Sequence, residues 1–186
     1  MGHGGREGSA GQERRDPSKK LIVETQDSPV RAERPRKLTD VTVDVKGRLK
    51  LPSNFQDFFR TSETKDFFIT TTDKKSVYIF PLEQWKKWEE RMTRPVNADE
   101  VELFEVLSFI SKKFGDDASV DKDGRMLLPK MLRDHFKMND TKVWLECKDD
   151  SIRVLNEEQY LALELAADED KLKRANALMK LMGGKF

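Results

Sequence analysis

The strongest constraint on this chain is an internal repeat. The segment VDVKGRLKLPSNFQDFF at Val43–Phe59 recurs 77 residues later, without a gap, as VDKDGRMLLPKMLRDHF at Val120–Phe136. The similarity continues after a two-residue deletion, where SVYIFPLEQW at Ser76–Trp85 matches SIRVLNEEQY at Ser151–Tyr160. Self-similarity of this kind, over about fifty residues, indicates a duplicated module that folds in the same way twice.

Each copy is expected to contain a strand, a turn, a short strand, a helix, two further strands and a second helix. The Asp-x-x-Gly sequences at Asp44–Gly47 and Asp121–Gly124 suit type I turns, with Asp at the first position and Gly at the fourth. Apolar residues alternating with polar ones around Leu49 predict a half-buried strand. Hairpins are expected within Phe67–Phe80 and Val143–Leu155.

Three longer helices are predicted from their start signals. In chain order these signals are Pro81, the pair Asn97 and Glu100, and the pair Asn156 and Gln159. The last helix is expected to break near Asp168 and to end at Met182, before two glycines. The acidic pairs Asp116-Asp117 and Asp149-Asp150 are interpreted as solvated turns.

One module alone is too small to be stable. Four or five short strands with exposed edges cannot close a core of useful size. Two copies packed against each other can bury a shared core. The sequence therefore predicts an α+β chain, mainly β, in which two half-folds form a pseudo-twofold dimer within one polypeptide.

The chain is predicted to have five parts. They are a disordered, mildly basic tail (1–37), a first module (38–92), a linker helix (93–115), a second module (116–165) and a charged helical extension (166–186). The tail holds nine Lys or Arg against six Asp or Glu, and it has too few apolar residues to offset its ordering entropy. It is either an unselected extension, in part a cloning remnant, or an arm that touches phosphates.

Composition removes several classes of function. The 35 Lys and Arg are balanced by 34 Asp and Glu, so whole-chain charge gives no support for nucleic-acid binding, and local placement of charge must carry that argument. The sequence contains no run of about 18 apolar residues, so no membrane span is predicted. The N-terminus lacks the apolar core of a signal peptide. Cys147 is the single cysteine, which excludes an intrachain disulfide and fits a reducing compartment.

The residues give little support for an enzyme. The two histidines are His3, in the tail, and His135, at a position that Phe58 occupies in the first copy. No His and Cys cluster has metal-ligand spacing, and no phosphate-binding loop or nucleophile elbow is present. Cys147 lies in a predicted strand and is expected to be a buried, inert thiol. We therefore expect no catalytic residue, no metal and no cofactor.

The repeated Asp-x-x-Gly-Arg turn is the remaining candidate site, and two interpretations stay open. In the structural one, Asp44 caps its own turn and Arg48 pairs with an acidic residue at a subunit boundary. In the binding one, aspartates hold the arginines rigid, so that each guanidinium can take a phosphate or a guanine edge in bidentate fashion. The candidate contact residues are Lys46, Arg48, Lys50, Lys122 and Arg125, supported by Asp44, Gly47, Asp121 and Gly124.

These segments carry a family resemblance. VDVKGRLKLP and VDKDGRMLLP resemble the two D-x-x-G-R motifs of the MraZ family of bacterial transcriptional regulators, and both continuations resemble that family's hairpin and helix. The resemblance covers about Leu38–Leu163. A single D-x-x-G-R match is a weak signal, whereas two matches at family-like spacing are specific.

The resemblance implies a fold, a partner and an assembly. The fold is a tandem pair of AbrB/SpoVT-like swapped-hairpin modules that form an intrachain pseudo-dimeric β-barrel with peripheral helices. The partner is double-stranded DNA, at short direct repeats in the promoter of the division and cell-wall gene cluster, which the family usually represses. The assembly is a homo-oligomeric ring in the cytoplasm, associated with the nucleoid, with no membrane and no small-molecule substrate. The motif residues map onto Asp44, Arg48, Asp121 and Arg125.

Three features depart from the family pattern. They are a tail of about forty residues, Asp123 at the place of Lys46 in the second turn, and the charged extension after Asp168. Two alternatives to a DNA-binding repressor remain open. One is an oligomeric scaffold whose Asp–Arg turns are interfacial salt bridges, and the other is an antitoxin-like AbrB relative that binds a toxin through one of the two extensions.

Overall fold

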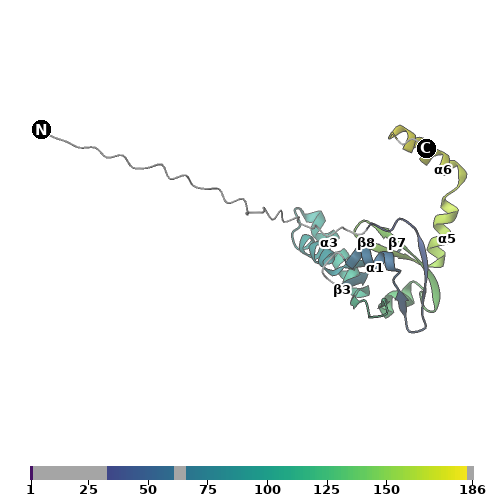
Figure 1. The fold of residues 1–186 in the computed structure, drawn as a ribbon, viewed down its shortest axis with the longest axis horizontal. Helices are drawn as coiled ribbons and strands as arrows, with labels where there is room; N and C mark the ends of the chain where they lie inside the picture. The colour runs from purple at the N-terminus through teal and green to yellow at the C-terminus, as the bar shows by residue number, and fades with distance from the viewer. Residues whose placement is uncertain (2–32, 61–65, 184–186) are drawn as a thin grey trace. The chain divides into compact units, whose positions relative to one another are not determined.

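The computed structural model describes residues 1, 33–60 and 66–183. The chain divides into two units, Met1–Val30 and Arg31–Phe186, and the fold described here is that of the second unit (Figure 1). The predicted disordered tail falls mostly on residues 2–32, outside the described residues. At the start of the second unit Pro35 is buried, and Arg34 donates a hydrogen bond of 2.8 Å from Nη2 to the carbonyl oxygen of Cys147.

The order of elements follows the repeat. The first module contains β1 (Thr39–Val43), β2 (Arg48–Lys50), α1 (Ser53–Arg60), β3 (Asp66–Thr70), β4 (Val77–Pro81) and α2 (Leu82–Met92). The helix α3 (Ala98–Phe114) joins the modules. The second module contains β5 (Asp116–Ser119), β6 (Arg125–Leu127), α4 (Lys130–His135), β7 (Thr141–Lys148), β8 (Ser151–Leu155) and α5 (Glu157–Ala166), followed by α6 (Glu169–Leu181).

The strands of the two modules are exchanged within one sheet. The eight strands lie in the order β5-β3-β4-β8-β7-β1-β2-β6, and each neighbouring pair is antiparallel. The first strand of each module leaves its own hairpin and pairs with the hairpin of the other module, β1 with β7 and β5 with β3. The predicted swapped-hairpin, pseudo-dimeric fold is therefore confirmed.

The pseudo-twofold axis passes between β2 and β6. Leu49 lies opposite Met126 at the centre of this pair. The Leu51 amide donates to the Gly124 carbonyl at 2.9 Å, and at the equivalent place the Leu128 amide donates to the Gly47 carbonyl at 3.0 Å. Strands β5 and β6 end the strand order, and the chain connects them directly through the Asp121–Gly124 turn, so the sheet forms a nearly closed barrel.

Both modules contribute to one hydrophobic core. Leu49, Phe55 and Ile79 from the first module are completely buried together with Met126 and Leu145 from the second. The helices lie at the periphery of the sheet (Figure 1). Because the core needs side chains from both copies, neither module has a complete core of its own.

Of the two capping boxes predicted at helix starts, one is half formed and the other is complete. At α3 the Asn97 side chain accepts a hydrogen bond from the Glu100 amide at 2.8 Å, as expected. The Glu100 carboxylate, however, accepts from the Val96 amide at 3.1 Å, so the predicted capping box is only half formed. At α5 the box of Asn156 and Gln159 is complete in both directions.

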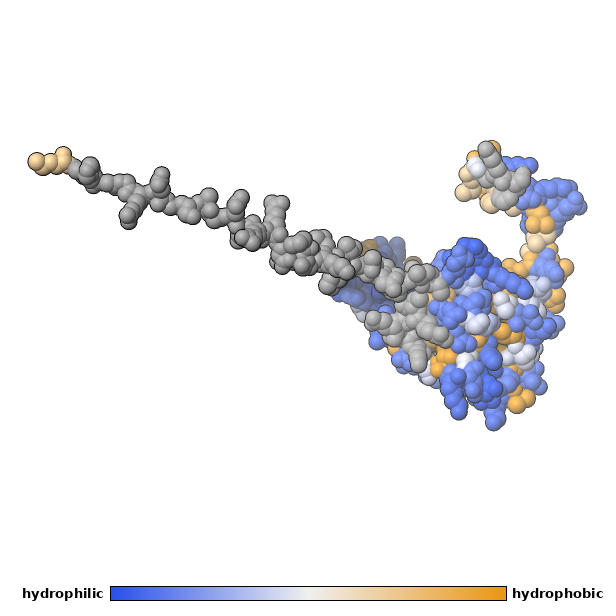
Figure 2. All heavy atoms as spheres, in the orientation of Figure 1, coloured by the Kyte–Doolittle hydropathy of each residue, from blue (hydrophilic) through white to orange (hydrophobic). Residues whose placement is uncertain are grey.

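The C-terminal helices present their apolar residues to solvent. The predicted break is confirmed, because α5 ends at Ala166 and Asp168 caps the start of α6. Neither α5 nor α6 has a buried residue, and Leu165 and Leu181 are 81% and 86% exposed. The visible face in Figure 2 is mostly hydrophilic, with apolar residues along these helices.

One prediction about the strands is wrong. Asp116 and Asp117 do not form a solvated turn but belong to β5, where their backbone pairs with Ile69 and Phe68. Backbone pairing overrides the low strand propensity of aspartate, and charged side chains are common on strands at the end of a sheet. On α4, Met131 is half exposed, and the fully buried Leu132 anchors the helix.

Among the described residues, no helix combines the length and the apolar character that crossing a membrane requires.

Candidate functional site

The first repeated turn is organised around the Asp44 carboxylate. Its Oδ1 accepts hydrogen bonds from the backbone amides of Lys46 and Arg48, each at 2.9 Å. Its Oδ2 accepts from Arg48 Nε at 2.9 Å and forms an ion pair with Nη2 at the same distance. These contacts, led by the bond from the Arg48 amide, lower the pKa of Asp44. The turn and the guanidinium are thus held by one ionised side chain.

Arg48 remains open to an external partner. Its side chain is 35% exposed although it pairs with Asp44. The ion pair uses Nε and Nη2, and within the described ranges no hydrogen bond occupies Nη1. The outer edge of the guanidinium can therefore donate to an acceptor on another molecule while Asp44 fixes its orientation.

The second turn repeats the backbone arrangement but not the side-chain pairing. Asp121 Oδ1 accepts from the amides of Asp123 at 2.9 Å and of Arg125 at 2.8 Å. The Arg125 guanidinium, in contrast, contacts Asp123 through Nη1 at 3.3 Å. The hypothesis that Asp121 holds this arginine side chain is therefore wrong. The bond from the Arg125 amide is the main cause of the lowered pKa of Asp121, and nearby Arg48 lowers it further.

Strand pairing brings the main candidate residues onto one surface. Lys50 lies opposite Arg125, and Arg48 lies opposite Leu127. Leu49 and Met126, which alternate with these residues along β2 and β6, are completely buried. Since successive side chains of a strand point to opposite faces, the residues Arg48, Lys50, Arg125 and Leu127 share the outer face.

The two turns lie at opposite ends of this strand pair. Lys46 is in the turn next to Leu128, and Lys122 is in the turn next to Leu51. Both lysines are exposed. We call the strands β2 and β6 with their two turns, residues 44–50 and 121–127, the basic ribbon. It carries all five candidate contact residues.

Glycine is required at both motif positions for two reasons. The backbone has a positive φ, and a side chain from the other module lies directly over the glycine. Gly47 has φ of 80°, and a Cβ added there would lie 2.3 Å from the guanidinium carbon of Arg133. Gly124 has φ of 76°, and a Cβ would lie 2.5 Å from Nε2 of Gln56. The sequence analysis missed both covering residues. They occupy equivalent positions of the repeat, which is the signal that could have revealed them.

The covering residues are anchored in the same way on both sides of the pseudo-twofold axis. Arg133 Nε donates to the Leu128 carbonyl at 2.9 Å, and Gln56 Nε2 donates to the Leu51 carbonyl at 2.6 Å. Arg133 therefore adds one more cation beside the first turn, whereas the second turn has a neutral amide at that place.

Substitution Gly47→Ala is expected to destabilise the fold by about 1–3 kcal/mol, because alanine is strained at positive φ and its Cβ would also displace Arg133. Urea unfolding followed by circular dichroism measures this change. Gly183→Ala is the matched control, since Gly183 has φ of 88° but no atom within 4 Å of an added Cβ. Equal losses in the two variants would show that the approach of Arg133 contributes nothing.

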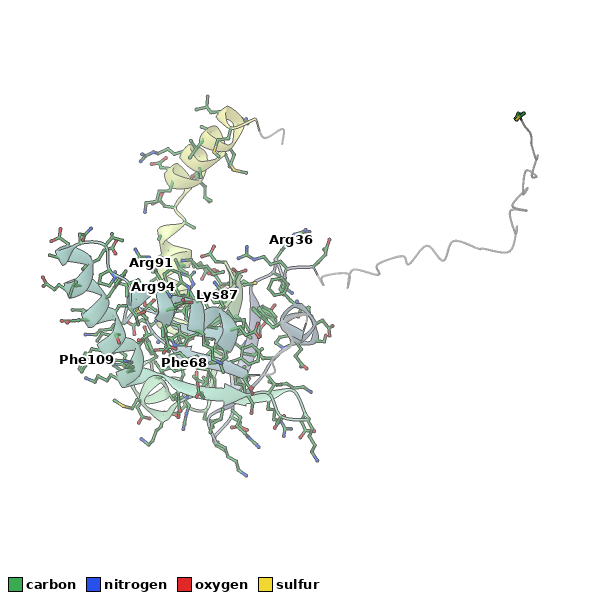
Figure 3. All side chains as sticks on the ribbon, turned by 90° about the vertical axis from the view of Figure 1, so that its left-hand side faces the viewer. Arg36, Phe68, Lys87, Arg91, Arg94 and Phe109 are labelled. Atoms are coloured by element: carbon green, nitrogen blue, oxygen red, sulfur yellow. The ribbon has the colours of Figure 1, made fainter. Side chains whose placement is uncertain are left out.

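A second group of cations, on α2, is largely neutralised within the protein. Lys87, Arg91 and Arg94 come from this helix and its C-terminal end (Figure 3). Arg91 pairs with Glu100 at 2.9 Å, and Arg94 pairs with Glu90 at 2.7 Å. This surface is therefore a weaker candidate for an anionic partner than the basic ribbon.

The other reactive side chains do not assemble a site. In the part of the chain that the structure describes, no group of three His, Cys, Asp or Glu side chains can hold a metal ion. His135 contacts the rings of Phe114 and Phe136, with centroids 5.0 and 4.8 Å away. Cys147 is half-buried, and burial raises the pKa of its thiol, which disfavours the reactive thiolate.

Comparison with known proteins connects this arrangement to a family. No family model matches the chain. The transcriptional regulator MraZ of Acidobacterium capsulatum is 35% identical over 94 residues, which are 50% of this chain and 62% of the relative. The MraZ regulators of Clostridium tetani and Oenococcus oeni are 32% and 29% identical, and each match covers 64% of the relative.

The matches thus span less than two thirds of the length of these three relatives. Their names describe regulators, which agrees with the prediction that the chain is not an enzyme. The duplicated Asp-x-x-Gly-Arg turns, the exchanged strands and these matches lead to the same conclusion: over about half of its length, the chain is similar to MraZ regulators.

Proposed function

We propose that this protein is a sequence-specific DNA-binding transcriptional regulator that contacts duplex DNA through the basic ribbon. The observation that carries the proposal is the geometry of Arg48. Asp44 holds two nitrogens of its guanidinium at 2.9 Å, and the outer edge remains accessible. Lys50 and Arg125 share the same face.

The dimensions and chemistry of DNA suit such a ribbon. The major groove admits a two-stranded β-ribbon as well as an α-helix. A fixed guanidinium can donate two hydrogen bonds to O6 and N7 of guanine, or to a phosphate. Phosphate contacts position a protein and base contacts specify the sequence, so we assign base recognition to Arg48 and phosphate contacts to the lysines.

Each protomer offers few contacts, and repetition would compensate for this. The proposed assembly is a ring that presents one basic ribbon per protomer to successive direct repeats in DNA. Once one ribbon is bound, the next is held at high effective concentration, and avidity can exceed single-site affinity by about 10²–10⁴. The proposed target is the promoter of the division and cell-wall gene cluster, with repression as the result and the nucleoid as the location.

Substitution Arg48→Ala is expected to weaken DNA binding by about 10- to 100-fold for each bound ribbon, the usual cost of losing one bidentate arginine contact. The DNA should come from selection of bound fragments from the source genome, and fluorescence anisotropy measures the affinity. Arg94→Ala is the matched control, because it removes one arginine charge just after the end of α2, outside the basic ribbon.

The control variant should bind DNA as the native protein does. Circular dichroism must show that both variants keep the native fold. If Arg48→Ala retains full affinity at moderate salt while it is folded, the basic ribbon does not contact DNA and the assignment fails.

An oligomeric scaffold is the second candidate, and the surface of α3 favours it. Leu103, Val106 and Phe109 are 65%, 58% and 63% exposed on this helix. Exposed apolar side chains of this size often mark protein contacts. In a scaffold the Asp44–Arg48 pair would only stabilise its own turn, and the salt dependence treated in the Discussion separates the two functions.

A further inference from the structure

A cavity of about 450 Å³ lies between α2 of the first module and the β7–β8 turn of the second. Four of its lining side chains are aromatic, namely Tyr78, Phe80, Trp85 and Trp88, and Met92 and Leu107 add apolar surface. Its polar lining comes mainly from Gln84 and the turn residues Lys148–Ser151. Its volume is in the range of about 300–1,000 Å³ that is typical of small-molecule sites. We call it the aromatic cavity.

The equivalent contact in the other half of the molecule is made by the protein itself. There, Gln159 completes the capping box of α5 with Asn156, and its Nε2 donates to the carbonyl oxygen of Lys75 in the β3–β4 turn. The side chain of Gln159 thus connects the start of α5 to the hairpin turn of the other module.

In the first half this connection is missing. The repeat places Pro81 where the second half has Asn156, and Gln84 where it has Gln159. Pro81 provides no side-chain cap to α2. Among the described residues no hydrogen bond engages the Gln84 side chain, which lines the aromatic cavity. At the same place in the two halves, Gln159 therefore bridges α5 and a hairpin turn, whereas the aromatic cavity separates α2 from its hairpin turn.

A buried donor lies in the wall of the cavity. Trp85 is 3% exposed, and its indole N–H finds no hydrogen-bond partner within the described ranges. Its ring is fixed by stacking on Phe68, with centroids 4.6 Å apart, and by contact with Phe80 at 5.3 Å. The Trp85 ring is therefore a rigid aromatic wall of the cavity.

The charge of the rim differs between the two halves. The turn beside the aromatic cavity carries Asp149 and Asp150 with Lys148. The equivalent turn in the other half carries Lys74 and Lys75 with Asp73. The turn residues on the open side thus carry one more negative than positive charge, and Trp88, 49% exposed, also lines the cavity.

We propose that the aromatic cavity binds a small organic cation as a ligand and not as a substrate. Its aromatic or alkyl body would pack against Trp85 and Trp88, and its ammonium group would lie between the aromatic faces and Asp149. Aromatic rings attract cations through their faces, and a nearby carboxylate strengthens this attraction. Such a ligand would connect the two modules where Gln159 does so on the other side.

The test uses the full chain and two probes of equal shape, 2-phenylethylammonium and the neutral 2-phenylethanol. Isothermal titration calorimetry measures both affinities. The native protein is expected to bind the cation saturably and at least fivefold more tightly than the alcohol. Trp88→Ala should weaken the binding of both probes, because it removes an exposed aromatic side chain from the cavity wall.

Asp149→Asn provides the sharper variant. Asp149 has φ of 52°, and asparagine tolerates this left-handed backbone conformation. The variant should lose at least fivefold in affinity for the cation while it binds the alcohol as before. Asp140→Asn is the matched control, because Asp140 has φ of 48° and is exposed outside the cavity.

Three results would overturn the proposal. The first is the absence of saturable cation binding up to the solubility limit of the probe. The second is equal binding of cation and alcohol to the native protein. The third is cation binding that Asp149→Asn and Trp88→Ala leave unchanged. Folding of each variant is checked by circular dichroism.

Discussion

Substitution Phe55→Ala is expected to lower the free energy of unfolding by about 3–5 kcal/mol, the usual cost of deleting a buried phenyl ring. Phe55 is completely buried on α1 within the core that both modules share. A loss of this size is a large fraction of the total stability of a domain. Urea unfolding followed by circular dichroism and tryptophan fluorescence measures it.

The loss should affect both modules together. Strand β1 pairs with β7 and β2 pairs with β6, so the second module cannot keep its sheet when the first unfolds. Hydrogen exchange at the amides of β7 should therefore accelerate as much as at those of β2. Phe109→Ala is the control, because the same substitution at a side chain 63% exposed should change stability by at most about 0.5 kcal/mol. Two separate unfolding transitions would contradict a shared core.

Raising the salt concentration fourfold, from 50 to 200 mM, is expected to weaken DNA binding about 40-fold if one ribbon contacts three phosphates and about 500-fold if it contacts five. The near-neutral net charge of +1 does not prevent this, because the effect depends on the cations at the interface. Fluorescence anisotropy at several salt concentrations gives the slope.

The salt slope distinguishes the two candidate functions. A DNA-binding regulator must give a steep slope, and Lys46→Ala should reduce it because one phosphate contact is lost. Lys87→Ala, on α2, should leave the slope unchanged. A shallow slope with the native protein would contradict the proposed function and favour the scaffold.

The pseudo-twofold packing was predictable because the repeat supplies a long-range constraint that local patterns lack, whereas the exchanged strands were expected only from the family resemblance. Two copies that are each too small to be stable must pack together, and the turn residues of each copy fix where its strands begin. The wrong prediction at β5 has a non-local cause. Asp116 and Asp117 have low strand propensity, and only the pairing of their backbone with β3 makes them a strand.

The contact between the motif aspartate and the motif arginine side chain was predictable in the first turn and not in the second. In the first turn Asp44 has no competitor, so spacing alone predicts its contact with Arg48. In the second turn Asp123 competes for Arg125, and three-dimensional geometry decides the outcome. Contacts across the pseudo-twofold axis, such as Arg133 over Gly47, depend on how the modules dock, and one copy of the motif contains no information about that.

The two ends of the basic ribbon are not equivalent, and under the proposed function this would give the DNA contact a direction. A perfectly symmetric ribbon would fit a stretch of duplex equally well after a half turn, and would favour inverted sequences. Here one turn has Lys46 with Arg133 nearby, and the other has Lys122 and Asp123 with Gln56 nearby. If the ribbon contacts DNA as proposed, the phosphates would favour one end over the other, and such a contact would suit binding sites that all have the same orientation along the duplex.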